Sequence, residues 1–312
     1  MNILLLGAAG FIGTNLTLQF VKNKNDIITL VDSKREYFSD IANEKYENIM
    51  IKEEEICEST DFESIVSNQD IVYHLVSTTV PSTSNQKIAQ ELTSNVVMTS
   101  NMLDACVKHG VKKIVFISSG GTVYGTEISC PLKEDTVTNP ISSYGIQKIT
   151  IEKLLYLYRY MYGLDYRIIR LANPYGPYQR PNGVIGAATT FTYKALRNEK
   201  VNVYGDGSVV RDFIYIDDAV RAIINIVRGE SQYRIFNLGC GYGTSIKQLI
   251  ETIENALGIR MNITYLPNRK VDVHINYLDI SRYEKEFGVL DPLPLKSGII
   301  RTAEFMKKNL II

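Results

Sequence analysis

A tyrosine and a lysine one helical turn apart are the residues of this chain best suited to proton transfer. They lie in the segment Tyr144-Gly145-Ile146-Gln147-Lys148, and residues i and i+4 share one face of a helix. Tyrosine is a weak base because its ordinary pKa is about 10, but a neighbouring ammonium group favours the phenolate. The spacing predicts a general base with a supporting cation. Two surface residues one turn apart would have the same spacing.

The N-terminal strand and the glycine-rich turn after it would place a dinucleotide beside that pair. The run Asn2–Leu6 is almost continuously apolar, which is typical of a buried parallel strand. Gly7 would allow a tight turn, Gly10 would let a pyrophosphate approach the backbone, and Gly13 would let helix and strand pack closely. The helix that follows would offer unpaired N–H groups and a positive dipole end to the phosphates.

An acidic residue at the end of the second strand indicates which dinucleotide is bound. The strand at residues 26–31 ends in Asp32, about 20 residues after the glycines. A carboxylate there accepts the ribose hydroxyls of NAD and repels a 2′-phosphate. Lys34 and Arg35 nearby leave NADP open as an alternative. An ordinary strand–turn–helix is the other interpretation. It ranks lower because the three glycines and Asp32 all agree with dinucleotide binding.

Strand and helix signals alternate through the first half, which predicts an α/β fold with a doubly wound parallel Rossmann sheet. Long helices are expected at residues 88–109 and 144–162. A breaker cluster at Asn173–Pro177 then introduces shorter elements. We therefore expect an NAD-binding domain at residues 1–172 and a smaller C-terminal α/β substrate domain at residues 173–312, with some of the chain crossing back. The second domain would cover the carboxyl ends of the strands.

Composition excludes several classes of partner. The 312 residues carry a formal net charge of zero, evenly spread, so no nucleic acid or anionic membrane partner is expected. No apolar run is long enough to span a bilayer, and no leader is expected before the first strand. The four cysteines lack metal or redox spacing, as do the three histidines, which predicts no metal site and a reducing cytoplasmic location.

Taken together, the motifs resemble those of the extended short-chain dehydrogenase/reductase superfamily, and within it NAD-dependent nucleotide-sugar epimerases of the UDP-glucose 4-epimerase type. The matching segments are Gly7–Gly13, Asp32, Tyr73-His74-Leu75, Ser118–Gly125, Tyr144-x-x-x-Lys148 and Arg211-Asp212-Phe213-Ile214-Tyr215. The resemblance runs from Asn2 to about Asp279. It implies a Rossmann domain that binds NAD and a smaller domain that binds a nucleoside diphosphate sugar, with UDP-glucose and UDP-galactose as the expected pair.

The resemblance also implies a set of binding residues. Cofactor contacts are expected at Gly7, Gly10, Phe11, Ile12, Gly13, Asp32, Glu55, Ile56, Leu75, Thr79, Asn95, Ser118, Tyr144 and Lys148. Glu55 stands where the family usually has Asp, so its adenine contact would be one methylene longer. Substrate contacts are expected at Thr122, Asn173, Asn202, Val203, Tyr204, Arg211, Arg269, Asp272 and Asn276. Two guanidinium groups suit a diphosphate because each presents a planar fork of donors.

One central position departs from the family pattern. The hydroxyl partner of the catalytic tyrosine normally stands three residues before Val-Tyr-Gly, and that residue here is Gly120. Thr122 is the preferred replacement, with Ser119 as the alternative. Related dehydratases and decarboxylases have acidic residues just before Val-Tyr-Gly. Gly121 and Thr122 provide none, which disfavours elimination and decarboxylation.

The resemblance implies epimerisation at C4. Tyr144 would remove the proton of the 4-hydroxyl while NAD takes the hydride, and the transient 4-keto sugar would turn over before reduction. An NAD(P)H-dependent 4-ketoreductase remains the alternative, and a nucleotide-sensing binding protein ranks below both.

Two further expectations concern assembly and the sugar. The helices at 88–109 and 144–162 are rich in apolar residues, and the family uses this pair in an intersubunit bundle, so a homodimer is expected. The apolar residues of the second helix that could form the dimer interface are Leu154, Leu155, Leu157, Tyr158 and Met161. Asn276 falls at the family position beside the sugar C2 substituent. A side chain smaller than tyrosine there would leave room for an N-acetyl group.

Overall fold

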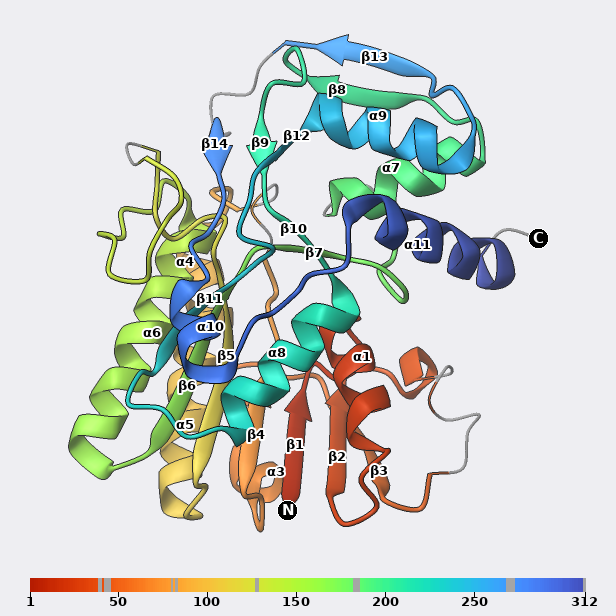
Figure 1. Ribbon diagram of the computed structural model, residues 1–312. Helices are drawn as coiled ribbons and strands as arrows, with labels where there is room; N and C mark the ends of the chain where they lie inside the picture. Colours follow the sequence, from red (N-terminus) through yellow and green to blue (C-terminus); the bar gives the residue numbers. More distant parts are fainter. Residues whose placement is uncertain are drawn as a thin grey trace. The chain divides into compact units, whose positions relative to one another are not determined.

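The apolar N-terminal run forms a central strand of a seven-stranded sheet among the described residues of the computed structural model (Figure 1). The strand order is β11-β6-β5-β4-β1-β2-β3. Pairing is parallel between β1 and β2, β1 and β4, β2 and β3, and β4 and β5. The order reverses between β1 and β4, so the sheet has the doubly wound topology expected from the sequence. Ligands of such sheets bind at this reversal, beyond the carboxyl ends of the strands. The strands are β1 (Asn2–Leu6), β2 (Ile27–Asp32), β3 (Ile49–Glu53), β4 (Ile71–His74), β5 (Lys113–Ser119), β6 (Asp165–Leu171) and β11 (Ile235–Leu238).

The structure describes residues 1–38, 41, 46–79, 81, 84–126, 129–181, 186–267 and 273–310. They form two compact units. Unit 1 comprises Met1–Ser118, Ser142–Ile169 and Gln232–Ile235, and unit 2 comprises Ser119–Ile141, Arg170–Ser231 and Phe236–Ile312. Residues 119–141 therefore group with unit 2, and residues 232–235 group with unit 1.

Helices of unit 1 cover both faces of its strands. Side chains alternate along a strand, so Val72 and Tyr73 of β4 face opposite sides. The Val72 side belongs to a buried cluster with residues of α3, α5 and α6. Tyr73 lies 5.3 Å from the Phe20 ring of α1, measured between centroids, so α1 covers the other side. The helices are α1 (Phe11–Phe20), η1 (Arg35–Phe38), α3 (Phe62–Val66), α4 (Ile88–Leu92), the π-helical turn η2 (Thr93–Val97), α5 (Met98–Lys108) and α6 (Ser143–Tyr162).

Both long helices expected from the sequence are present. Helix α6 begins after Ser142, whose side chain accepts a hydrogen bond from the Gly145 N–H, and it ends at Gly163 with φ +75°. A glycine tolerates that left-handed conformation. The other helix continues from α4 through η2 into α5. Its π-helical turn, which the sequence did not predict, surrounds Asn95. Such turns are often found at functional sites.

Unit 2 contains shorter elements around two small buried clusters, one centred on α7, α9 and α11 and one beneath β8. Strand β10 pairs with β7, β8 with β13, and β9 with both β12 and β14. The elements are β7 (Asn173–Tyr175), α7 (Ala187–Leu196), β8 (Val201–Tyr204), β9 (Val210–Arg211), β10 (Phe213–Tyr215), α8 (Ile216–Arg228), β12 (Thr244–Ser245), α9 (Ile246–Leu257), β13 (Ile263–Leu266), β14 (Ile275–Asn276), α10 (Ser281–Phe287) and α11 (Leu295–Asn309).

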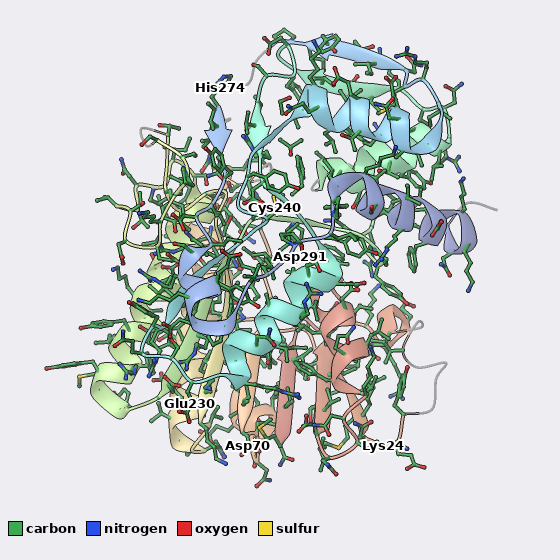
Figure 2. All side chains as sticks on the ribbon, viewed as in Figure 1. Lys24, Asp70, Glu230, Cys240, His274 and Asp291 are labelled. Carbon is green, nitrogen blue, oxygen red and sulfur yellow. The ribbon has the colours of Figure 1, made fainter. Side chains whose placement is uncertain are left out.

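Membrane-spanning helices, metal-binding groups and the state of the cysteines can be examined in the described residues. Within the described residues no helix is long and apolar enough to cross a membrane. The same residues contain no group of three His, Cys, Asp or Glu side chains that could hold a metal ion. The four cysteines are free thiols, and Cys240, labelled in Figure 2, is buried.

Candidate active site

The glycine-rich turn has the geometry that a bound pyrophosphate requires. Gly7 has φ +82°, and a Cβ atom there would lie 3.0 Å from the Val76 nitrogen. A Cβ at Gly13 would lie 2.5 Å from the Ala8 oxygen, so glycine is needed for helix and strand to pack. Gly10 is the N-cap of α1, and the fully described first turn of α1 carries no acidic residue. Its positive end is therefore open to an anion.

Asp32 lies against this turn. One carboxylate oxygen accepts a hydrogen bond of 2.9 Å from the Ala9 N–H, and the other accepts one of 2.8 Å from the Ser33 N–H. Leu75, beyond the end of β4, approaches the same turn, since its carbonyl carbon would lie 3.1 Å from a Cβ at Gly7. The structure thus brings together three parts of the expected cofactor site, and these residues fit NAD.

Lys148 is buried on α6 beside Tyr144. Only 7% of its surface is exposed, and its ammonium group donates a 2.9 Å hydrogen bond to the Ile117 carbonyl oxygen. The Nζ atom lies 5.4 Å from the centroid of the Tyr144 ring and 4.7 Å from that of Phe116. Burial lowers the pKa of Lys148 to about 8, and the nearby Glu152 carboxylate opposes this shift. The expected tyrosine–lysine pair is therefore formed.

Tyr144 is not a phenolate in the protein alone. Burial raises the pKa of its hydroxyl to about 12, which is opposite to the direction expected from a lysine one turn away. The physical reason is that desolvation outweighs a cation that is itself buried and already hydrogen-bonded to Ile117. Among the described residues the Tyr144 hydroxyl has no hydrogen-bond partner. It is therefore free to bond a ligand.

Three of the expected cofactor contacts, Ser118, Asn95 and Thr79, are held by polar partners in unit 1. The Ser118 hydroxyl donates a 2.6 Å hydrogen bond to Glu152. The Asn95 side-chain oxygen accepts one of 3.0 Å from the Thr78 N–H, and the Thr79 hydroxyl donates one of 3.2 Å to Gln147.

Sequence reasoning missed Glu152 and Gln147. Glu152 lies four residues after Lys148, so the i, i+4 spacing on α6 was the available signal for it.

The two residues expected to contact adenine differ in exposure. The Glu55 side chain is exposed, whereas the Ile56 side chain belongs to the buried cluster of unit 1. Their contacts with adenine remain predictions.

In unit 2, a leucine explains the departure from the family pattern at Gly120. A Cβ atom at Gly120 would lie 2.5 Å from Cδ1 of Leu278 and 3.1 Å from the Arg170 carbonyl oxygen. A larger residue there would require the Leu278 side chain to move and the Arg170 carbonyl group to shift slightly, so glycine fits this position best. The Thr122 hydroxyl oxygen is buried and has no hydrogen-bond partner in the described part of the chain.

Unit 2 also brings together three of the expected substrate residues. Arg211 of β9 is the register partner of Asn276 of β14. Asn276 is 1% exposed and donates a 3.1 Å hydrogen bond to the Gly120 carbonyl, while its side-chain oxygen lacks a partner among the described residues. Asn173 donates through its side chain to the Asp212 carbonyl oxygen at 2.9 Å. These contacts place Asn276 next to both the Gly120 segment and Arg211.

Asp212 is a buried residue that sequence reasoning did not assign to the site. Its carboxylate accepts hydrogen bonds from the Cys240 N–H at 2.7 Å and the Leu278 N–H at 3.2 Å. Burial raises its pKa. Asp212 therefore joins the segments that carry Asn173, Arg211 and Asn276, and a buried aspartate directly after the predicted Arg211 was the only sequence signal.

The remaining expected substrate residues differ in whether their side chains are accessible. In β8, Asn202 and Tyr204 are exposed, but the Val203 side chain is in the core, so only its main chain could meet a ligand. Arg269 and Asp272 lie outside the described residues.

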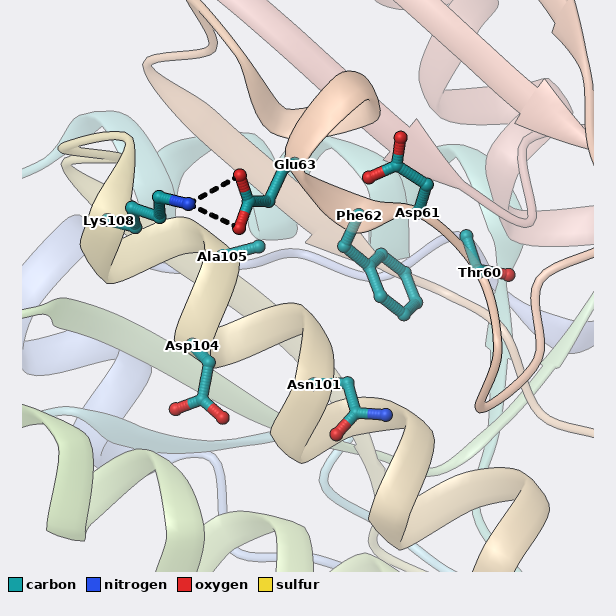
Figure 3. A pocket seen from close by; sticks show the side chains of 8 residues that line it. All are labelled: Thr60, Asp61, Phe62, Glu63, Asn101, Asp104, Ala105 and Lys108. Atoms are coloured by element: carbon teal, nitrogen blue, oxygen red, sulfur yellow. Dashed lines mark hydrogen bonds and ion pairs between the residues drawn. The ribbon is translucent and has the colours of Figure 1, made fainter.

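A surface pocket of about 350 Å³ lies elsewhere in unit 1 (Figure 3). It contains the Lys108–Glu63 ion pair, with an N–O distance of 2.5 Å, and none of the residues expected at the active site. The other lining residues are Thr60, Asp61, Phe62, Asn101, Asp104 and Ala105.

The chain is similar over its length to known proteins. The model of the NAD dependent epimerase/dehydratase family matches residues 3–239. A UDP-glucose 4-epimerase from Mycolicibacterium smegmatis is 32% identical over 315 residues, which cover 99% of each chain. The crystal structure of UDP-glucose 4-epimerase from Thermotoga maritima with UDP-glucose is 34% identical, has a TM-score of 0.91, and covers 99% of this chain and 100% of that one. A UDP-N-acetylglucosamine 4-epimerase from Methanobrevibacter ruminantium, solved with UDP-N-acetylmuramic acid, is 29% identical with a TM-score of 0.88 and 99% coverage of both chains.

Proposed function

The chain belongs to the NAD-dependent epimerase/dehydratase family, and from that premise we propose that it interconverts UDP-glucose and UDP-galactose at C4. It is an NAD-dependent nucleotide-sugar 4-epimerase, and its cofactor is NAD. The observation that supports the glucose–galactose pair is the similarity, along the whole chain, to a UDP-glucose 4-epimerase solved with UDP-glucose.

The proton transfer belongs to Tyr144. Its hydroxyl has no partner among the described residues, so it can bond the sugar 4-hydroxyl and take its proton. NAD held by the glycine-rich turn and Asp32 would supply the acceptor and donor of the C4 hydride, and its positive charge would favour the phenolate form of Tyr144. Lys148, fixed by the Ile117 carbonyl, holds a positive charge 5.4 Å from the tyrosine ring centre. Thr122 orients the 4-hydroxyl through its unpaired hydroxyl oxygen.

Substrate binding falls to unit 2. Arg211 and Arg269 bind the diphosphate through the donors of their guanidinium groups, and Asp272 and Asn173 are further substrate contacts. Asn202, Val203 and Tyr204 lie next to the uracil base. The exposure of Asn202 and Tyr204 supports this for those two side chains.

Asn276 leaves the sugar specificity broad. Its amide nitrogen is used by Gly120, and its unpaired oxygen can accept a hydrogen bond from the N–H of a 2-acetamido group. The enzyme therefore also accepts the N-acetyl forms of the two UDP-sugars. The sugars without an N-acetyl group should still bind, because leaving part of the pocket unfilled costs only a modest amount of binding free energy.

One experiment tests the epimerase against the alternatives. We expect the purified protein to retain NAD and to convert UDP-galactose to UDP-glucose with no added reductant, because an epimerase regenerates its cofactor in each cycle. A 4-ketoreductase would instead consume one NAD(P)H for each 4-keto sugar reduced. A nucleotide-sensing protein would bind UDP-sugars without turnover. Absence of conversion by a protein that retains NAD would reject the proposal.

We propose that the enzyme is a homodimer joined through α6. Helix α6 exposes large apolar side chains near its C-terminal end, namely Tyr156, Leu157, Tyr160, Met161 and Tyr162. Of the residues named from the sequence, Leu157 and Met161 are exposed, but Leu154, Leu155 and Tyr158 pack within unit 1. We expect light scattering at micromolar concentration to give the mass of two chains, and Leu157→Glu to give one. A wild-type monomer would reject the dimer.

A cytoplasmic location is also proposed. The four free cysteines support it, because unpaired thiols persist in a reducing compartment. Fractionation of cells that produce the protein from its own gene should recover it with cytoplasmic markers, and recovery with membranes would contradict this.

A further inference from the structure

A carboxylate outside the expected active site is hydrogen-bonded to the first turn of the catalytic helix. Glu91, on α4, is 7% exposed. One of its carboxylate oxygens accepts hydrogen bonds from the Ser143 hydroxyl at 2.6 Å and from the Gln147 amide nitrogen at 3.2 Å. The same Gln147 nitrogen donates to the Ser143 hydroxyl oxygen at 2.9 Å. We call these three residues the Glu91 network.

The network contacts the residues that directly precede the two catalytic side chains. Ser143 precedes Tyr144, and Gln147 precedes Lys148. Residues 143 and 147 are four apart and share one helix face, so Tyr144 and Lys148 share the face one residue further round. Fixing the first pair to α4 therefore fixes the rotation of the first turn of α6, and with it the direction of the phenol and the ammonium group.

Glu91 also contacts Asn95, one of the expected cofactor residues. The Glu91 carbonyl oxygen accepts a 3.0 Å hydrogen bond from the Asn95 side chain in the π-helical turn. The Thr79 hydroxyl donates to the other end of Gln147. Cofactor-side residues and catalytic residues are thus connected through one network in unit 1.

Glu91 is ionised although it has no cationic partner in the described part of the chain. The Ser143 hydroxyl bond lowers its pKa most, with backbone N–H groups of residues 85–87 adding to the effect, and together they outweigh the desolvation that raises it. The negative charge also lies at the N-terminal end of α6, where the helix dipole favours an anion. A neutral side chain could accept a hydrogen bond from Ser143, but it would lack the favourable charge interaction with the dipole of α6.

We propose that Glu91 is a positioning residue for catalysis, which holds Tyr144 and Lys148 in their reactive orientation through Ser143 and Gln147. This inference rests on the proposed epimerase function. It assigns Glu91 no contact with substrate, and its effect should appear in the chemical step, because a displacement of about 1 Å can cost about a hundredfold in rate.

The test compares Glu91 variants with a matched control on the same helix. Asp104 of α5 also accepts a hydrogen bond from an α6 hydroxyl, that of Tyr158 at 2.6 Å, but near the other end of the helix. We expect Glu91→Ala to lower kcat roughly 10- to 100-fold while KM and the NAD content change less than about threefold. Glu91→Gln, which retains one acceptor, should recover part of kcat. Asp104→Ala should keep kcat within about twofold of wild type.

A double variant tests whether the residues act as a unit. If Glu91 acts through Ser143, Glu91→Ala combined with Ser143→Ala should lower kcat no more than Glu91→Ala alone. Effects that multiply independently would overturn the inference, as would an active wild-type enzyme whose Glu91→Ala form keeps kcat within about twofold.

Hydrogen exchange separates this inference from the proposed function. Glu91→Ala should speed amide exchange in a peptide covering residues 143–150, and Asp104→Ala should do so only near Tyr158. A wild-type enzyme inactive on every UDP-sugar would reject the proposed function but not the exchange result. Unchanged exchange at residues 143–150 in Glu91→Ala would reject the network whatever the activity.

Discussion

The polar residues around the start of α6 and those around Gly120 differ in how their hydrogen-bonding groups are used. In unit 1, Lys148, Ser118 and Thr79 all bond to other groups of the chain. In unit 2, the described residues provide no partner for the Thr122 hydroxyl oxygen or the Asn276 side-chain oxygen, although both atoms are buried. Buried polar atoms are normally paired, so such exceptions need an explanation.

The difference separates positioning groups from reacting groups. A group paired inside the protein contributes to stability and fixes its neighbours, whereas an unpaired one is available to a ligand. Around the start of α6 the exception is Tyr144, because its hydroxyl has no described partner while the helix that carries it is held by the Glu91 network. Substitutions of unpaired groups should therefore alter kinetics directly. Substitutions of paired groups should alter stability, and they should alter kinetics only where the pair holds a catalytic residue in place, as the Glu91 network does.

The largest effect is expected from Tyr144→Phe. The ring is retained but the proton acceptor is lost, so kcat should fall by about 10²–10⁴, the usual contribution of a general base. Thermal stability and bound NAD should be unchanged, because the hydroxyl has no described partner. Tyr158→Phe is the matched control, since its hydroxyl bonds to Asp104, and it should lose stability but not kcat. A Tyr144→Phe enzyme that keeps more than about a tenth of kcat would contradict the assignment.

The pH dependence of stability should report Lys148, a paired group. Burial lowers its pKa from 10.5 to about 8 in the folded chain. Below pH 8 both states carry the proton, and the folded state bears the full cost of the buried charge. Between about pH 8 and 10.5 the unfolded chain binds more protons, so the free energy of unfolding rises with pH. The rise should be about 3 kcal/mol, or two orders of magnitude in the folding constant.

Urea unfolding of the NAD-free protein and of Lys148→Met across pH 7.5–10.5 measures the contribution of Lys148 to this pH dependence. Tyrosine and cysteine titrations are common to both proteins, so the difference between their free energies of unfolding should change by the stated amount. A difference that stays constant with pH would mean that Lys148 is not desolvated as its contacts indicate.

Periodic features of the sequence predicted most of the fold. The apolar run of β1, the glycines after it and the two long helices follow from local patterns, and the structure has them close to where they are expected. Strands of two or three residues, such as β9, β12 and β14, are too short to produce a period. The π-helical turn around Asn95 has no sequence signal of its own.

The site was predicted less completely because its supporting contacts join distant residues. Ser143 and Glu91 are 52 residues apart, and Asn276 and Gly120 are 156 apart. A single sequence carries no record of which polar side chain meets which. Motifs identified the reacting residues Tyr144 and Lys148, but not the carboxylates of Glu91, Glu152 and Asp212 that hold the surrounding segments.

Thr122 and Ser119, the last residue of β5, offer a comparison between two hydroxyl groups of unit 2. Thr122→Ala should lower kcat roughly 10- to 100-fold if its unpaired hydroxyl orients the sugar, with no loss of thermal stability. Ser119→Ala should lower kcat less than about threefold. Thr122→Ser is the control that keeps the hydroxyl, and it should retain most of the activity. The opposite order of the two alanine variants would assign the role to Ser119.

The smallest effect is expected at Asn276, whose amide is half paired. Its nitrogen bonds to Gly120 and its oxygen is unpaired, so the residue should combine a structural contribution with a choice between sugars. We expect the wild-type kcat/KM values for the plain and N-acetyl sugar pairs to lie within about 100-fold of each other, as unfilled space alone allows. Asn276→Leu keeps the volume but removes the amide. It should weaken the N-acetyl pair about tenfold relative to the plain pair, and it should also lose stability because the Gly120 carbonyl then lacks its donor. A wild-type preference above about 100-fold for the plain sugars would show that other residues close the pocket, and an unchanged ratio in Asn276→Leu would show that the unpaired oxygen does not contact the sugar.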